Sequence, residues 1–309
     1  MSLQPIKIFF LSLLALPGCP DRTADTSTNA APVKPALVSG ENNDFNDYWF
    51  SGVAELNAYR LQQNRYGETR EGEAVLIFVT EPFSLSEQVK IDEPRSTEEE
   101  DKVSVLKMNA LRRFSTGIYD YSMMSSVFTP ISWDKYPHTL KLTCSSQDWC
   151  GHSWTQLNRT DDGYRLRQMS YFQAEGDIET NLGEALTEDE LFNRLRINPG
   201  QVETEKVNLI PGLFFARTAH QKLKPKQARI SFKREKEASV RCVVEYLHLD
   251  RTLLIDFGSE FPHEIIGWEE IDNGQTTVKA VRNRALRSPY WQRNGNEYAY
   301  LRDSLGLRN

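Results

Sequence analysis

The sequence lacks the short motifs of several large enzyme classes. It has no Gly-x-Ser-x-Gly elbow, no His-Glu-x-x-His pair and no glycine-rich phosphate loop. It is also poor in histidine and cysteine, with 5 and 4 residues in a chain of 309. These absences argue against an elbow-type serine hydrolase, a zinc protease and a P-loop nucleotidase. We therefore expect a protein that has neither catalytic activity nor a cofactor.

A strong charge of either sign is also missing. The chain carries 37 Lys and Arg against 43 Asp and Glu, and the part from Gln221 onward carries 16 against 12. This small basic excess gives no support to nucleic-acid binding. With 39% apolar and 26% charged residues, the composition is typical of a globular protein, which we expect to be a monomer.

The only long apolar run lies at the N-terminus. Lys7 precedes residues 8–16, which are apolar except for Ser12, and the run ends in "LPGC" at Cys19. It is too short for a membrane-spanning helix and has the layout of a secretory signal. Its end resembles a bacterial lipobox, which implies cleavage before Cys19 and lipidation of that thiol; an ordinary signal peptide with a coincidental cysteine is the alternative. We expect residues 1–18 to be a signal peptide and the protein to be exported and lipid-anchored to the bacterial cell envelope, at the outer membrane.

The remaining chain divides by composition into a tether and a body. Residues 19–43 are rich in Ser, Thr, Asn, Ala and Pro and contain almost no large apolar side chains. Such a segment cannot bury enough surface to offset the entropy lost on ordering, so it predicts a flexible tether. Residues 44–309 predict a single β-rich domain. A division into two sheet halves near residues 184–200 is an open alternative.

Runs of β-branched and aromatic residues separated by turn residues fill most of the body. Residues 74–80 form one dense run, and the segments that flank residues 161–163 predict a hairpin. For residues 50–61 a helix competes with a hairpin, and we favour the hairpin. The pattern predicts a mainly β fold of the α+β kind, built on a large curved antiparallel sheet or half-open barrel.

Helix signals are strong at only one place in the body. Within residues 185–200, "ALTEDELFNRLRINPG", Thr187 and Glu190 have the spacing of a capping box. We therefore predict one interposed helix there and a short C-terminal helix near residues 296–305. Residues 206–220, "KVNLIPGLFFARTAH", are predicted to belong to the β pattern.

Two segments repeat the order aromatic, Pro, His ahead of an apolar strand. They are Tyr136-Pro137-His138 and Phe261-Pro262-His263. Proline suits the entry to a strand because it has no N–H to donate to the ladder. We favour a coincidence of two strand entries over a remote duplication.

The segment "CSSQDWCGH" contains Cys144, Cys150 and His152. In an oxidising compartment, two cysteines at the ends of neighbouring strands can form a disulfide. We favour the pair Cys144 and Cys150, with Cys144 and Cys242 as the competing pair. Five intervening residues are not the spacing of a structural zinc site or a thioredoxin-like site, so no metal is expected. Cys242, flanked by valines, is expected to be a buried and inert thiol.

Cys150 and His152 also offer a catalytic alternative. Residues two apart on a strand point to the same face, so a thiolate and an imidazole could form a nucleophile pair here. The mixture of aromatic and polar side chains suits a binding surface as well, although ordinary sheet packing competes with it. The candidate ligand-binding residues are Trp149, His152, Trp154 and Trp268.

Five segments of the body resemble a family of exported lipoproteins of Gram-negative bacteria whose activity is uncharacterised. They are "YGETREGEAVLIFVTE" (66–81), "STGIYDYSMMSS" (115–126), "SSQDWCGHSWTQLN" (145–158), "SYFQAEGD" (170–177) and "FPHEIIGWEE" (261–270). Members are often labelled septum-formation inhibitors of the Maf type, which implies a cytoplasmic nucleotide pyrophosphatase with an N-terminal Ser-x-Ser-Pro-Arg-Arg loop. That loop does not occur in this sequence and the export signal contradicts the label, so we do not adopt it.

The succession of antiparallel strands with one interposed helix looks like the half-barrel of periplasmic lipoprotein carriers of the LolA and LolB type. The concave face of those carriers holds acyl chains. This second resemblance concerns the architecture, and a shared fold does not by itself transfer a function.

Together these features predict a membrane-anchored, exported lipoprotein without catalysis. It would bind a hydrophobic ligand or an envelope protein, or support envelope assembly. An envelope hydrolase or transferase that uses Cys150 and His152 is the first alternative. A purely structural envelope protein is the second, and a concave sheet face filled with side chains would favour it.

Overall fold

The computed structural model describes residues 43–93 and 97–307. The predicted signal peptide, Cys19 and nearly all of the predicted tether lie outside these residues. Within the described ranges, no helix is long and apolar enough to cross a membrane.

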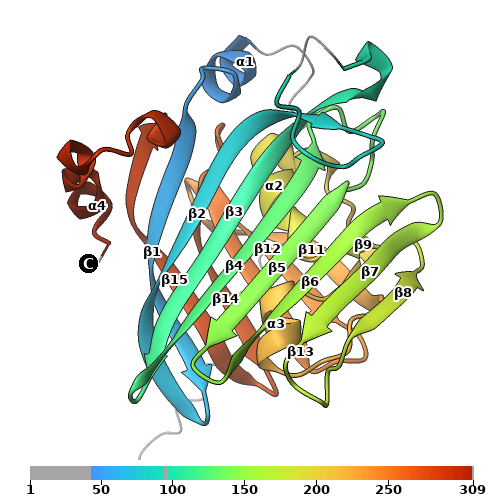
Figure 1. Ribbon diagram of the computed structural model, residues 1–309, viewed down its shortest axis with the longest axis vertical. Helices are drawn as coiled ribbons and strands as arrows, with labels where there is room; N and C mark the ends of the chain where they lie inside the picture. Colours follow the sequence, from blue (N-terminus) through green and yellow to red (C-terminus); the bar gives the residue numbers. More distant parts are fainter. Residues whose placement is uncertain (1–42, 94–96, 308–309) are drawn as a thin grey trace, which may run out of the picture. The chain divides into compact units, whose positions relative to one another are not determined.

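Fifteen strands form one sheet, in the order β8-β7-β6-β5-β4-β3-β2-β1-β15-β14-β13-β12-β11-β10-β9. Neighbouring strands are antiparallel, except that β9 runs parallel to β10. The sheet is curved and open, which confirms the predicted fold class (Figure 1). The strands are β1 (Ala54–Arg65), β2 (Glu68–Ser84), β3 (Lys102–Thr116), β4 (Tyr119–Pro130), β5 (Lys141–Asp148), β6 (Gly151–Thr160), β7 (Gly163–Ser170), β8 (Ile178–Leu182), β9 (Leu186–Thr187), β10 (Glu205–Ile210), β11 (Lys226–Lys236), β12 (Ser239–Tyr246), β13 (Arg251–Gly258), β14 (Ile265–Asp272) and β15 (Gln275–Ser288).

One strand pairing and one short connection determine how the sheet curves. β1, the first strand, pairs with β15, the last, with Ala54 opposite Ser288. The two edge strands, β8 and β9, are joined by only three residues, so Leu182 and Leu186 are at most about 14 Å apart. The sheet therefore bends far enough to bring its edges close together, and its inner face encloses a space.

Turn residues explain the tight hairpins. Asn273 and Gly274 between β14 and β15 both have positive φ values, 49° and 71°. Tyr66 and Gly67 between β1 and β2 have values of 58° and 76°. Two such residues match the right-handed twist of the strands they join. The hairpin predicted in place of a helix for residues 50–61 is thus confirmed, since β1 begins at Ala54.

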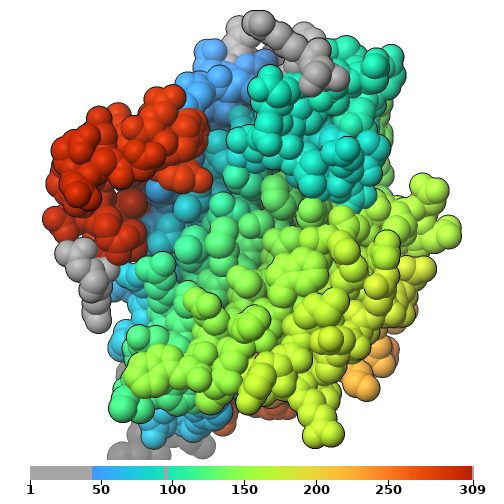
Figure 2. All heavy atoms as spheres, in the orientation of Figure 1, coloured from blue at the N-terminus to red at the C-terminus, as the bar shows by residue number. Residues whose placement is uncertain are grey.

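Two of the four α-helices in the described residues fill the concave side of the sheet. α2 (Glu190–Ile197) and α3 (Leu213–Thr218) lie between strands β2 to β8 and strands β10 to β15, as Figure 1 shows. The other two, α1 (Asn43–Trp49) and α4 (Tyr300–Leu305), lie outside this space. The outer faces of the strands in front form a continuous surface in Figure 2.

The predicted interposed helix and the short C-terminal helix are confirmed as α2 and α4. The capping box is present as well, because the Glu190 N–H donates to Thr187 Oγ1 at 3.3 Å and the Thr187 N–H donates to Glu190 Oε2 at 3.3 Å. The β prediction for residues 206–220 is wrong beyond Ile210. α3 is buried over Leu213–Ala216, and a short apolar run that is buried throughout has no period to separate helix from strand.

A buried ion pair holds α2 against the first strand. Arg196, fully buried, binds Glu55 through two parallel hydrogen bonds of 2.5 and 2.6 Å. Glu55 also accepts hydrogen bonds from Tyr48 and Asn57. Burial opposes ionisation of Glu55, but Arg196 and these donors lower its pKa to about 2. The carboxylate therefore stays ionised down to strongly acidic pH.

The two aromatic-Pro-His segments meet α2 in the same way. Arg194 Nη2 donates to the carbonyl oxygen of Pro137 at 2.5 Å, and Arg196 Nε donates to that of Pro262 at 2.8 Å. Each proline lies in a loop ahead of a strand, β5 or β14. Both loops thus supply a backbone acceptor to arginines two residues apart on one helix.

Breaking the Arg196–Glu55 pair tests this account of α2. Arg196→Met should lower the free energy of unfolding by about 3–5 kcal/mol, because it leaves Glu55 charged and buried without its partner. Urea unfolding of Arg196→Met, Glu55→Gln and the double variant gives the coupling energy. Additive losses from the two single variants would contradict the role assigned to the pair.

Candidate functional site

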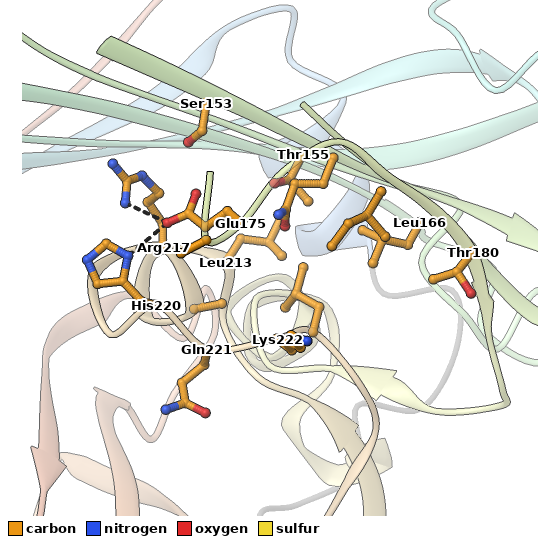
Figure 3. A pocket seen from close by; sticks show the side chains of 15 residues that line it. Ser153, Thr155, Leu166, Glu175, Thr180, Leu213, Arg217, His220, Gln221 and Lys222 are labelled. Atoms are coloured by element: carbon orange, nitrogen blue, oxygen red, sulfur yellow. Dashed lines mark hydrogen bonds and ion pairs between the residues drawn. The ribbon is translucent and has the colours of Figure 1, made fainter. Parts of the chain in front are cut away.

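A cavity of mixed lining lies between β6 to β8 and α3, on the concave side of the sheet (Figure 3). We call it the α3 cavity. Its volume is about 220 Å³. The apolar lining consists of Leu166, Ala174, Ile178, Leu213, Ala216 and Leu223; the polar lining consists of Ser153, Thr155, Gln168, Glu175, Thr180, Arg217, His220, Gln221 and Lys222.

Three ionisable side chains gather at one end of the α3 cavity. Glu175 Oε1 accepts a hydrogen bond from Arg217 Nη1 at 3.0 Å and lies 2.8 Å from His220 Nδ1. Ser170 Oγ donates to the other carboxylate oxygen at 2.7 Å. In Figure 3 this group lies beside Ser153, while Leu166 and Thr180 lie toward the opposite end. The cavity thus has a charged end and a more apolar end.

Arg217 differs from a fully satisfied buried arginine. Only 9% of its side chain is exposed, and its guanidinium packs over the Phe172 ring at 4.5 Å. Its Nε–H has no hydrogen-bond acceptor within residues 43–93 and 97–307. A buried donor without an acceptor costs about 1–3 kcal/mol, so an acceptor brought by a ligand would be stabilising here.

The volume of the α3 cavity limits what it can hold. An engineered apolar cavity of about 150 Å³ takes up benzene, whereas pockets for drug-sized ligands measure about 300–1,000 Å³. At about 220 Å³ the cavity is large enough for one ring or one short alkyl chain. A lipid with several acyl chains is too large for it.

A second hollow lies on the outer side of the sheet, under α4. It measures about 180 Å³ and is mainly apolar, with Leu56, Val75, Ile77, Leu111, Leu305 and Leu307 in its lining. Leu305 belongs to the small cluster that packs α4 onto β1 and β2. We attribute this hollow to incomplete packing of the helix and not to a binding site.

A charged network lies deeper in the sheet, near the start of α3. Arg251 binds Glu188 at 2.5 Å and Glu270 at 3.1 Å, and Arg112 binds Glu270 at 2.6 Å. Asp189 accepts a hydrogen bond from the backbone N–H of Leu213 at 2.9 Å. Burial, followed by the negative charge of Glu188, raises the pKa of Asp189 to about 7. This carboxyl therefore changes charge near neutral pH.

The predicted disulfide between Cys144 and Cys150 is wrong. All cysteines in the described part, Cys144, Cys150 and Cys242, are free. Cys144 points inward from β5, opposite Thr155, whereas Cys150 lies in the turn that follows Asp148. Asp148 lies four residue steps along the strand from Cys144, which is about 13 Å and far beyond disulfide reach. The competing pair, Cys144 and Cys242, is not formed either: both thiols are free, and both are buried.

The predicted nucleophile pair lies outside the α3 cavity. Cys150 and His152 are both exposed, at the β5–β6 turn and the first residues of β6. Asp148 Oδ1 accepts a hydrogen bond from the backbone N–H of Cys150 at 2.7 Å, but within the described residues no acidic or amide side chain is hydrogen-bonded to the Cys150 thiol or to the His152 ring. Also within those residues, no group of three or more His, Cys, Asp or Glu side chains is arranged to hold a metal ion.

The four candidate ligand-binding residues separate into three environments. Trp268 is a core residue, packed against Tyr59 and Phe192. Trp154 and His152 lie on the outer face of β6, and Trp149 is at the exposed β5–β6 turn. None of these residues lines the α3 cavity.

Sequence reasoning missed the residues that do form the charged end of the cavity. Arg217 and His220 lie in the segment that was predicted to be strand, and Glu175 lies in the β7–β8 loop. The sequence contains no spacing rule that joins these two segments, which are more than forty residues apart. The only available signal was Phe214-Phe215-Ala216-Arg217 as one buried turn of helix that ends in a cation.

Comparisons with known proteins give no assignment. No protein-family model, no curated protein and no solved structure matches the chain. The resemblance to exported lipoproteins and to lipoprotein carriers therefore stays a prediction.

The charge change at Asp189 should appear in the pH dependence of stability. Its pKa is raised from 3.8 to about 7 in the folded protein, so the folded state holds a proton that the unfolded chain releases. Stability is therefore lost as pH rises between these two values, by up to about 4 kcal/mol. Asp189→Asn keeps an acceptor for the Leu213 N–H, and it should gain stability relative to the wild type from pH 4 to 7 and no more above that.

Urea unfolding at several pH values measures this difference, with Asp162→Asn at the exposed β6–β7 turn as the matched control. A flat difference between Asp189→Asn and the wild type would show that Asp189 does not take up a proton on folding.

The free cysteines give a second test. Iodoacetamide should modify Cys150 in the native protein without prior reduction, whereas Cys144 and Cys242 should react only after unfolding, because burial excludes the reagent and raises the pKa of both thiols. Peptide mapping by mass spectrometry measures each site. Native labelling of Cys144 would contradict its buried position. Labelling of Cys150 follows from exposure alone, so it gives no support to a catalytic role.

Proposed function

We propose that the protein is an exported, lipid-anchored envelope protein without catalytic activity that binds one small amphipathic molecule in the α3 cavity. The observation that carries this proposal is the buried Nε–H of Arg217, which has no acceptor among the described residues and adjoins an apolar space. The parts of the proposal that concern export, the outer-membrane location and the anchor at Cys19 rest on the N-terminal sequence.

The lining favours a ligand with an anionic or carbonyl group at one end. Among the lining residues, Arg217 and Lys222 are cationic and Glu175 is anionic. Glu175 already accepts from Arg217, His220 and Ser170, so its acceptor capacity is largely used. Of the donors in the lining, the buried Nε–H of Arg217 is the one that neither solvent nor an acceptor of the described residues satisfies, and charge-assisted hydrogen bonds to guanidinium are stronger than neutral ones.

The apolar part of the ligand would lie against Leu166, Ile178 and Leu213. Contact with these side chains removes apolar surface from water, at roughly 25 cal/mol per Å². The cavity volume of about 220 Å³ supports a single short chain or one ring as the apolar part. A medium-chain carboxylate has both features, and octanoate is a suitable probe.

A structural role is the second candidate, and one observation favours it. α2 and α3 occupy the concave side of the sheet, and buried residues of both helices belong to the main core. A filled inner face leaves no room for the acyl chains that lipoprotein carriers hold. The two candidates differ in one respect: only the binding role requires the α3 cavity to take up a ligand.

Filling the cavity tests the proposed binding. Octanoate should bind the wild type in calorimetric titrations at neutral pH, and Thr155→Phe should weaken binding by about tenfold or more because its ring occupies the cavity. Arg217→Met should weaken it by about tenfold, since one hydrogen bond to a charged group contributes about 1.5–3 kcal/mol. Hexadecanoate should bind no more tightly than octanoate, because the longer chain has no space.

Thr143→Phe is the matched control. It is the same substitution on the neighbouring strand β5, but Thr143 faces outward, opposite Gln156. It should leave octanoate binding unchanged, and urea unfolding should show all three variants folded. If neither carboxylate binds the wild type, the structural role is favoured.

A further inference from the structure

The four most exposed large apolar side chains of the described residues lie at one end of the sheet. Tyr66, Ile118, Trp149 and Tyr171 are 61, 81, 69 and 70% exposed. They stand at the ends of successive hairpins: β1–β2, β3–β4, β5–β6 and the β7–β8 loop. In an antiparallel meander these four connections are all on the same side, at the bottom of Figure 1. We call them the tip residues.

Strand spacing places the tip residues in a row. Strands β1 to β8 are consecutive neighbours, so one hairpin tip follows the next after two strand spacings, or about 10 Å. Four tips therefore extend over about 30 Å along one rim of the sheet. Exposed apolar residues elsewhere, such as Trp291 and Tyr300 near the C-terminus, do not belong to this rim.

Local structure holds two of these rings in place: Tyr66 through a strained backbone conformation, and Tyr171 through a glycine beneath its ring. Tyr66 has a φ of 58°, a left-handed conformation that favours glycine or asparagine, and its hydroxyl lies 2.8 Å from that of Tyr121. The Tyr171 ring lies directly over Gly151, where a Cβ would come within 2.6 Å of the ring. Exposed aromatic side chains are therefore positioned by the turns and not left loose on the surface.

The cationic residues at the same end add a second feature. Lys222 and Lys224 are exposed in the segment between α3 and β11, and neither has an ion-pair partner in the part of the chain that the structure describes. Lys222 also lines the α3 cavity, across from Glu175 of the β7–β8 loop. An anionic surface that meets the tip residues would come near these two cations.

We propose that the tip residues form a docking surface for a lipid bilayer that contains anionic lipids. Tyrosine and tryptophan are favoured at the boundary between headgroups and acyl chains, because one part of the ring is apolar and the other is polar. Each lysine near an anionic leaflet adds attraction that decays within a Debye length. The proposal concerns the surface and holds whether or not the α3 cavity binds a ligand.

The geometry favours a bilayer over a protein partner. A stable protein interface buries about 800 Å² on each side in a contiguous, closely packed patch. The tip residues are separated by about 10 Å with polar turn atoms between them, so they do not form such a patch. A bilayer interface does not need contiguity, because each ring enters it independently.

The test uses vesicle flotation with the full chain carrying Cys19→Ser, so that no acyl anchor contributes. Vesicles are made of three parts phosphatidylethanolamine to one part phosphatidylglycerol. In this background, Trp149→Ser with Tyr171→Ser should lower the partition constant for vesicle binding by about tenfold or more, because the two rings no longer bury apolar area in the bilayer. Trp291→Ser with Tyr300→Ser is the matched control and should leave binding within about twofold of the parent.

Two further readouts separate the possible results. Brominated lipids should quench tryptophan emission in the parent and much less in Trp149→Phe, since only Trp149 of the tip residues is an indole. Lys222→Gln with Lys224→Gln should weaken binding to these vesicles but not to phosphatidylcholine vesicles. All tip variants should bind octanoate as the parent does, which distinguishes this proposal from the proposed function.

Equal flotation of the tip variant, its control and the parent would overturn the proposal. So would tip variants that keep vesicle binding but change the elution volume on size exclusion, because the rim would then be an interface between copies of the chain.

Discussion

Arg194 and Arg196 are charged side chains on a helix buried inside a curved sheet, and the rest of the structure is arranged to satisfy them. Each of the three nitrogen groups of Arg196 has an acceptor, two on Glu55 and one on Pro262. Burying a guanidinium costs several kcal/mol unless its charge is paired and its donors are bonded. The acceptors come from the first strand, from the loop before β14 and, for Arg194, from the loop before β5. One helix thus fixes three distant parts of the sheet relative to each other, and it occupies space that a carrier would leave free.

The pairing of buried charges and hydrogen-bonding groups also indicates where a ligand can bind. Around α2 both arginines are paired with carboxylates or backbone carbonyl groups, although Asn193 Oδ1 has no hydrogen-bond partner among the described residues. Near α3 the charged groups themselves are incompletely matched. Arg217 keeps a buried N–H without an acceptor. Burial, followed by the negative charge of Glu188, raises the pKa of Asp189 to about 7. Incomplete pairing destabilises a fold, so it is retained where it serves another purpose or where a ligand completes it. The α3 end of the interior is therefore the part of this molecule in which chemistry beyond folding is to be sought.

Local sequence rules predicted the fold better than they predicted the site. Alternating burial along strands such as β13, the Asn273-Gly274 turn and the Thr187 and Glu190 capping box all depend on residues close together in the chain. α3 was not predicted because a buried turn of helix and a buried strand have the same apolar composition. The disulfide prediction was wrong because the separation of two cysteines in the sequence does not determine which face of a hairpin each one occupies, or how far along the strand it lies. Glu175 and Arg217 meet only through tertiary folding, so no pattern in the sequence could pair them.

The pairing of β1 with β15 has a consequence for the order of events during synthesis. Ala54 cannot pair with Ser288 until that residue, more than two hundred positions later, has been synthesised, and only then is the centre of the sheet complete. Until then β1 has one partner and a free edge, and the Arg196 pocket lacks the Pro262 carbonyl. Contacts this far apart form late and slowly, because loop closure must precede any gain from them. A chain that emerges gradually from a channel therefore passes through a long period with an exposed central strand, and its last fifty residues decide when that period ends.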